Sequence, residues 1–280
     1  MVTIITDTAS DMDAEDYERL SIVPLPLSVT FGDKTYLETK ELTKDVFYDK
    51  LLNTSDFPTT SQPTPEDFSR VFSEATKDGG EAVYISISSR LSGTCSTAKF
   101  VKEDGNFDRV YIVDSKIATG GQKILAEHAA KLRDHGKCAA DIADELEYVV
   151  SHMKLYACLD TLNYLAKGGR LSHGTAFMGN LLDIKPVITF IGSELSVVGK
   201  PFGMKNGMNL ILSMMKKHVP DMHFPIYTLF TYDSTNARGL IDLLHDVGGF
   251  AVDRSSLLNV GAAIGTHIGP YACGIVYVEE

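Results

Sequence analysis

Short apolar runs alternate with amphipathic stretches over the first half of the chain. Residues 2–6, 82–87 and 110–113 are rich in Val and Ile, a composition typical of buried strands. Apolar residues recur at helical spacing within residues 13–20, 46–51, 68–75, 119–135 and 142–153. Strands that alternate with helices predict an α/β fold in which an N-terminal domain has a largely parallel sheet flanked by helices.

Polar residues mark the start of one of these helices clearly. Thr64 is a preferred N-cap residue, and Pro65 and Asp67 complete the signature of a helix start. The segment just before it, Thr60-Ser61-Gln62, is predicted as a loop with two hydroxyls and an amide. An ordinary polar turn is the alternative to a binding site there.

The pattern changes near residue 155. Residues 187–191 and 195–198 predict a hairpin, and residues 226–232 predict another strand. We therefore expect an N-terminal α/β domain at residues 1–155 and a C-terminal α/β domain with a mixed sheet at residues 156–280. Residues 260–278 predict a strand, a glycine-rich bend and a last strand.

The strand predicted at residues 82–87 leads into the clearest candidate site. Ser92, Gly93 and Thr94 lie where the loop after this strand meets the next helix. Ligands of open α/β sheets bind beyond the carboxyl ends of strands, and a helix N-terminus attracts anions. These residues are a candidate cradle for a small anionic group, and a helix capped by its own serines is the alternative.

Two further motifs carry polar groups that suit a ligand. In Lys167-Gly168-Gly169-Arg170 the glycine pair ends a helix and presents two cations from a turn. His267 is predicted to lie in the glycine-rich bend near the C-terminus, where a side chain is reachable. A structural or merely exposed histidine is the alternative.

Composition narrows the class of protein. The balance of 44% hydrophobic and 22% charged residues is that of a folded soluble protein, and the net charge of −11 argues against nucleic acid as the main partner. The four cysteines are scattered without a C-x-x-C pair, so the sequence predicts neither a zinc site nor a disulfide framework. We also expect no signal peptide and no membrane span, and hence a cytoplasmic location.

Five motifs in the same order resemble those of the DegV family, which includes the fatty-acid-binding subunits of bacterial fatty acid kinase. They are Asp7-Thr8-Ala9-Ser10-Asp11, Thr60-Ser61-Gln62-Pro63, Ser88-Ser89-Arg90-Leu91-Ser92-Gly93-Thr94, Lys167-Gly168-Gly169-Arg170 and Gly265-Thr266-His267-Ile268-Gly269-Pro270. The resemblance covers about residues 2–279. Tyr271 departs from it, because many members have glycine there.

The resemblance implies a two-domain lipid-binding protein, not itself an enzyme, with a tunnel between its domains. The tunnel would hold one long-chain fatty acid, such as palmitate, stearate or oleate. A separate ATP-dependent kinase subunit would phosphorylate the bound acid to an acyl phosphate for phospholipid synthesis. No cofactor or metal is implied, and transient contact with a membrane is compatible with this role.

The same resemblance implies roles for individual residues. Thr60 and Ser92 would hold the carboxylate, with Ser61, Gly93 and Thr94 beside them. Arg170 and His267 would support phosphoryl transfer at the entrance. Candidates for the tunnel wall are Met214, Met215 and the pair Phe177-Met178, for each of which a plain core is the alternative.

Three other functions remain open from the residues alone. A serine-dependent acyl hydrolase would use Ser92 as the nucleophile, but no G-x-S-x-G elbow surrounds it. A stand-alone kinase lacks the phosphate-binding loop G-x-x-x-x-G-K-[ST]. A binding module or regulator for a small phosphorylated metabolite would use the same cradle.

Overall fold

A computed structural model describes residues 1–171 and 183–280. The chain forms two compact units, the first comprising Met1–Leu42 and Thr60–Ser151 and the second Thr43–Thr59 and His152–Glu280. Residues 43–59, from the N-terminal part of the chain, therefore belong to the second unit. The predicted residues Phe177 and Met178 lie outside the described ranges.

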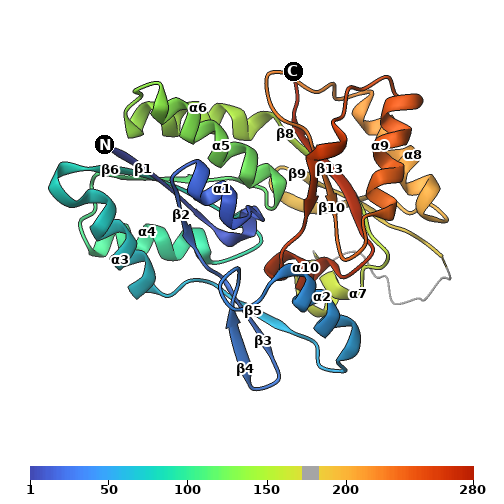
Figure 1. The fold of residues 1–280 in the computed structure, drawn as a ribbon, viewed down its shortest axis with the longest axis horizontal. Helices are drawn as coiled ribbons and strands as arrows, with labels where there is room; N and C mark the ends of the chain where they lie inside the picture. Colours follow the sequence, from blue (N-terminus) through green and yellow to red (C-terminus); the bar gives the residue numbers. More distant parts are fainter. Residues whose placement is uncertain (172–182) are drawn as a thin grey trace. The chain divides into compact units, whose positions relative to one another are not determined.

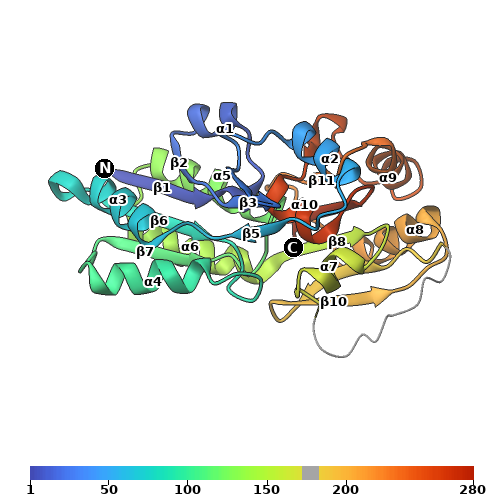
Figure 2. The ribbon, with the colours of Figure 1, turned by 90° about the horizontal axis from the view of Figure 1, so that it is seen from below.

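The first unit is built on a parallel sheet. Its elements are β1 (Val2–Asp7), η1 (Thr8–Ser10), α1 (Ala14–Arg19), β2 (Ile22–Leu25), β3 (Ser28–Phe31), β4 (Lys34–Leu37), β5 (Thr59–Ser61), α3 (Pro65–Thr76), η2 (Lys77–Gly79), β6 (Glu81–Ser86), α4 (Thr94–Asp104), β7 (Val110–Asp114), α5 (Gly120–Asp134) and α6 (Ala139–His152). Among the described strands the parallel sheet has the order β2-β1-β6-β7. Figure 2 shows its strands between α1 and α4. The predicted parallel sheet is confirmed.

Helices on both faces bury the sheet. Helix α3 packs on α4 and β6, whereas α5 packs on β1 and β6 and bonds to α1 through Lys123 and Asp16. Side chains such as Phe68, Phe72 and Tyr84 form a fully buried aromatic core between α3 and the sheet. The predicted cap of α3 is confirmed, because Thr64 and Asp67 bond reciprocally to each other's backbone N–H groups.

One short strand corrects a prediction. Thr60 and Ser61 belong to β5, which pairs with β3 in a small sheet of order β4-β3-β5, and not to a loop. Thr is a β-branched residue that favours extended backbone. The local sequence gave no sign of the pairing because its partner strand lies about thirty residues earlier in the chain.

The second unit is built on a mixed sheet, as predicted. Its elements are α2 (Lys44–Asn53), β8 (Met153–Cys158), α7 (Asn163–Lys167), β9 (Val187–Ile191), β10 (Glu194–Gly199), α8 (Met204–Met215), β11 (Tyr227–Phe230), α9 (Thr235–Asp246), η3 (Arg254–Ser256), β12 (Leu257–Asn259), α10 (Ala262–Ile268) and β13 (Cys273–Val278). Within the described ranges the strand order is β10-β9-β8-β13-β11-β12, with only β11 and β12 parallel. Helices α8 and α9 lie side by side (Figure 1) and cover one face of this sheet. Met215 is fully buried in the core beneath them, and Met214 packs against that core from a partly buried position.

Helix α10 corrects a second prediction. Residues 262–268 form a helix where a glycine-rich bend was expected, so His267 lies in a last helical turn. Glycine has low helix propensity, which explains the prediction. The glycine is needed for packing, because a Cβ at Gly265 would lie 2.7 Å from both the Phe47 ring and the Tyr48 hydroxyl oxygen on α2. Helix α9 and strand β12 were not predicted at all.

Candidate functional site

The loop between β6 and α4 is held by backbone hydrogen bonds at its start. The N–H of Ser88 donates to the carbonyl of Ile117 at 2.8 Å, and the N–H of Ser89 donates to a carboxylate oxygen of Asp114 at 3.1 Å. Helix α4 then begins at Thr94, with Gly93 as its N-cap. The strand, loop and helix start predicted from the sequence are confirmed.

Ser92 and Thr94 form a pair of hydroxyls at the start of α4. Their oxygens are 2.7 Å apart, and the Ser92 oxygen also accepts a 3.3 Å hydrogen bond from the Thr94 N–H. Ser92, the residue before the N-cap Gly93, therefore bonds to the first N–H of its own helix, which is in line with the alternative interpretation. The bond between the hydroxyls uses one hydroxyl hydrogen, so the pair retains a second hydrogen that can be donated to an anion.

Gln62 links the two groups of predicted carboxylate-binding residues in the first unit, those of β5 and those at the start of α4. Its amide nitrogen donates to the Thr97 hydroxyl of α4 at 2.6 Å. A Cβ at Gly93 would lie 2.7 Å from the Gln62 amide oxygen, so Gln62 packs directly on the backbone of Gly93. The end of β5, which carries Thr60 and Ser61, is thereby brought beside the helix start that carries Ser92, Gly93 and Thr94.

A buried carboxylate that the sequence analysis noted only within a motif lies under this loop. Asp7 is completely buried at the end of β1. It accepts hydrogen bonds from the Tyr84 hydroxyl at 2.8 Å and the Ile87 N–H at 2.9 Å. Burial raises the pKa of the Asp7 carboxyl, and these hydrogen bonds oppose the shift. The sequence signal that could have identified this buried carboxylate is an acidic residue directly at the end of an apolar strand.

In the second unit, the two cations of the Lys-Gly-Gly-Arg motif take different directions. The ammonium of Lys167 lies over the Phe57 ring, 5.6 Å from its centroid. The Arg170 guanidinium instead donates to the carbonyl of Gly168 at 2.6 Å and lies close enough to His267 to affect its ionisation. Gly169 has φ of 70°, so the predicted turn after α7 is confirmed.

His267 is partly buried and neutral near pH 7. Burial, and then the charge of Arg170, lowers its pKa to about 4. The ring packs closely on the C-cap of α7, because a Cβ at Gly168 would overlap its Nδ1 atom. The structure therefore brings His267 and Arg170 together around the end of α7.

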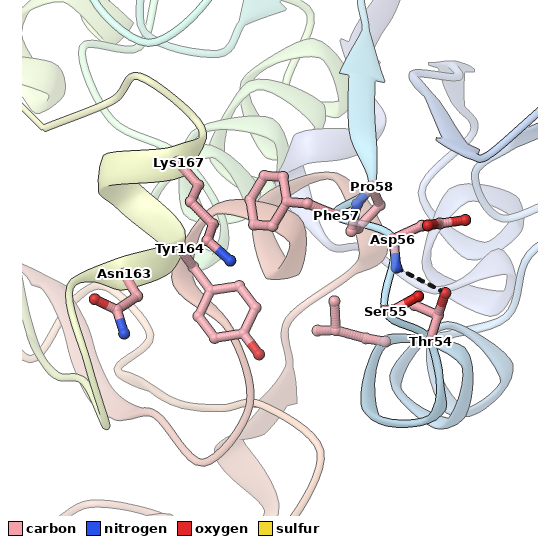
Figure 3. Close-up of a pocket in the computed structure, with 9 residues that line it drawn as sticks. Thr54, Ser55, Asp56, Phe57, Pro58, Asn163, Tyr164 and Lys167 are labelled. Atoms are coloured by element: carbon pink, nitrogen blue, oxygen red, sulfur yellow. Dashed lines mark hydrogen bonds between the residues drawn. The ribbon is translucent and has the colours of Figure 1, made fainter.

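A pocket of about 190 Å³ lies next to this group, between α7 and the segment that follows α2. Figure 3 shows Lys167 and Tyr164 on one side and the chain from Thr54 to Pro58 on the other. The Phe57 and Tyr164 rings are 6.1 Å apart, and Gly269 also packs against the Tyr164 ring. Sequence analysis missed this pocket because its two walls are about a hundred residues apart in the chain.

The site residues are divided between the units. Thr60, Ser61, Ser92, Gly93 and Thr94 belong to the first unit, and Arg170 and His267 to the second. Among residues 1–171 and 183–280, no three His, Cys, Asp or Glu side chains are grouped as metal ligands would be. No helix in the described part of the chain is long and apolar enough to cross a membrane.

The sequence profile of the DegV family, described as a family of uncharacterised proteins, matches residues 1–280. The chain belongs to the DegV family. A DegV domain-containing protein of Listeria monocytogenes is 30% identical over 278 residues, which span 99% of this chain and 98% of the relative.

Solved DegV structures share the whole fold. A DegV family protein from Thermus thermophilus, described by its fatty acid binding, is 29% identical with a TM-score of 0.89, covering 100% of this chain and 99% of that one. DegV from Bacillus subtilis, described as a fatty acid binding protein, is also 29% identical, with a TM-score of 0.85 and the same coverage. The predicted fold class is therefore confirmed over both units.

This DegV chain accommodates its departure at Tyr271 with a left-handed backbone and an aromatic contact. Tyr271 has φ of 64°, the left-handed conformation that glycine adopts freely. Its ring contacts Tyr232 edge to face, with centroids 5.4 Å apart. Such aromatic contacts contribute about 0.5–1.5 kcal/mol, which offsets a left-handed backbone cost of similar size.

Proposed function

We propose that this DegV-family chain binds one long-chain fatty acid and presents its carboxylate to a separate kinase subunit. The observation that carries the proposal is the hydroxyl pair of Ser92 and Thr94 at a helix N-terminus, linked through Gln62 to the strand of Thr60. Relatives with 29% identity over the whole chain are described as fatty-acid-binding.

Neutral donors suit a carboxylate that must later react. Thr60 and Ser92 would hold the carboxylate, with Ser61, Gly93 and Thr94 beside them. Hydroxyl and N–H groups orient the acid without the strong ion pair that would reduce its nucleophilicity. Affinity would come from the tail, because about fifteen buried methylenes at about 0.8 kcal/mol each contribute roughly 12 kcal/mol before entropy costs.

Arg170 and His267 would serve the phosphoryl transfer. A carboxylate oxygen would attack the γ-phosphorus of ATP held by the kinase subunit, the bond to the ADP oxygen would break, and ADP would leave. The resulting acyl phosphate would supply phospholipid synthesis in the cytoplasm. The Arg170 guanidinium would stabilise the negative charge on the transferring group. His267, neutral at pH 7, would contribute a hydrogen bond in place of a second cation.

Native mass spectrometry of the protein purified from bacteria tests the binding step. We expect a one-to-one adduct whose extracted ligand has the mass of a common fatty acid, and a reduced adduct in Ser92→Ala. A protein that is empty and takes up no added fatty acid would contradict the proposal. A phosphate-bearing adduct would favour the metabolite-binding alternative.

The division of roles needs a second measurement. Arg170→Ala should still bind the fatty acid, but transfer from ATP in the presence of a fatty acid kinase subunit should fall. Loss of binding with transfer retained for the acid already bound would assign Arg170 to the carboxylate instead.

A further inference from the structure

The first two residues of the Asp7–Asp11 motif have no part in the function proposed above, yet each bonds to a different segment. Asp7 uses one carboxylate oxygen to accept from the Ala9 N–H at 3.2 Å, which caps η1. The other oxygen accepts from the Ile87 N–H at 2.9 Å. Ile87 is the first residue after β6 and opens the loop that leads to Ser92. The second oxygen therefore fixes the start of the Ser92 loop.

Thr8 holds both ends of the β3–β4 hairpin. Its hydroxyl oxygen accepts from the N–H of Leu27 at 3.0 Å, and its hydrogen is donated to the Glu38 carboxylate at 2.6 Å. The Glu38 N–H in turn donates to the Leu27 carbonyl at 2.9 Å. Leu27 directly precedes β3, and Glu38 directly follows β4. Since β3 pairs with β5, Thr8 anchors the small sheet that includes Thr60.

The burial of these groups makes the arrangement specific. Asp7, Thr8 and Glu38 are all at least 97% buried. Buried polar groups cost free energy unless their hydrogen bonds are made, so each of these bonds has a strong preference for one geometry. Asp7, the last residue of β1, thus positions the Ser92 loop, and Thr8, the next residue, positions the small sheet that includes Thr60.

We propose that Asp7 and Thr8 are positioning residues that set the spacing between the Ser92 and Thr60 hydroxyls, and thereby the recognition of the carboxylate headgroup. This inference rests on the proposed fatty acid binding. Asp7 acts through the Ile87 N–H, and Thr8 acts through the hairpin that pairs with β5. Neither residue contacts the ligand. A misplaced hydroxyl would weaken the hold on the carboxylate and leave the apolar tail unaffected.

The test compares two ligands that differ only in the headgroup. Affinities of Asp7→Asn and Thr8→Val for palmitic acid and for hexadecan-1-ol would be measured by titration in native mass spectrometry. Each variant should bind palmitic acid at least about tenfold more weakly than the wild type does, because a hydrogen bond to the ligand is lost. A tenfold loss corresponds to about 1.4 kcal/mol. The alcohol should stay within about twofold, because tail burial is unchanged.

Two matched variants separate positioning from stability. Thr6, in β1 two residues before Thr8, is as buried as Thr8, but its hydroxyl bonds to the Ile85 carbonyl of β6 and to the Gln122 amide. Thr6→Val should therefore leave the ratio of acid to alcohol affinity unchanged even if the protein is less stable. Thr8→Ser keeps the hydroxyl and should restore acid binding. If Asp7→Asn does not fold, the Thr8 variants carry the test alone.

The outcomes are distinct. Equal loss of acid and alcohol in Asp7→Asn and Thr8→Val, or unchanged binding of both, would overturn the positioning role. A wild-type protein that binds neither ligand would instead contradict the proposed function itself.

Discussion

The side-chain amide of Gln62, just after β5, donates a 2.6 Å hydrogen bond to the hydroxyl of Thr97 in the first turn of α4. The bond crosses 35 residues of sequence and places the Gln62 amide oxygen against the backbone of Gly93. Glycine at position 93 is therefore a requirement of this contact and not of the backbone, whose φ of −70° suits any residue.

Gly93→Ala should reduce the free energy of unfolding by about 0.5–1.5 kcal/mol, because the new Cβ would push the Gln62 amide out of its hydrogen bond with Thr97. Urea unfolding measures the change. The double variant Gly93→Ala with Gln62→Ala removes the overlap, so the glycine substitution should cost much less in the Gln62→Ala background. Equal costs in both backgrounds would show that Gln62 does not restrict position 93.

His267 should make the protein less stable at acid pH. Its pKa is about 4 in the folded protein and 6.5 ordinarily, so between these values the unfolded chain binds a proton that the folded chain does not. Stability is therefore fully present above pH 6.5 and declines as the pH falls toward 4, by up to about 3 kcal/mol. Urea unfolding between pH 7.5 and 4 should show a smaller decline in His267→Gln. Parallel pH profiles for the two proteins would contradict a lowered pKa.

Gly265→Ala and Gly239→Ala place the same methyl group in two helices. At Gly265 the Cβ would lie 2.7 Å from Phe47 and Tyr48, whereas at Gly239 the nearest atom is 3.9 Å away. Gly239→Ala should raise the free energy of unfolding by about 0.5–1 kcal/mol through helix propensity. Gly265→Ala should lower it, since overpacking costs about 1–3 kcal/mol. If thermal unfolding gave both variants the same sign, the close packing of α10 on α2 would be refuted.

Only one cysteine should react readily in the folded protein. Cys138 is exposed, whereas Cys95, Cys158 and Cys273 are buried. Burial also raises the pKa of all three buried thiols, that of Cys158 to about 12, so little reactive thiolate forms. A thiol reagent should therefore modify one cysteine in buffer and all four in urea, and none in folded Cys138→Ser. Rapid modification of a second cysteine in buffer would show that one of the buried positions opens.

Much of the fold could be predicted because its signals are local. Reciprocal bonds between Thr64 and Asp67 span three residues, and the apolar runs of β1, β6 and β7 are continuous in the sequence. The loop that carries Ser92 was predicted for the same reason, since a strand, a glycine and a helix start follow one another directly. The parallel sheet of the first unit, the mixed sheet of the second and the five motifs of the DegV family could all be predicted from such local patterns.

The rest was decided by contacts between distant residues. Thr60 lies in a strand because β3 is available to pair with it, and His267 lies in a helix because Gly265 allows α10 to approach Phe47 and Tyr48. Asp7 bonds to Ile87, eighty residues later in the chain. The sequence determined which residues carry polar groups and where elements with local signals, such as α3 and α4, begin. Only the tertiary structure decided which of those groups meet, because long-range hydrogen bonds and close packing depend on partners that no local pattern specifies.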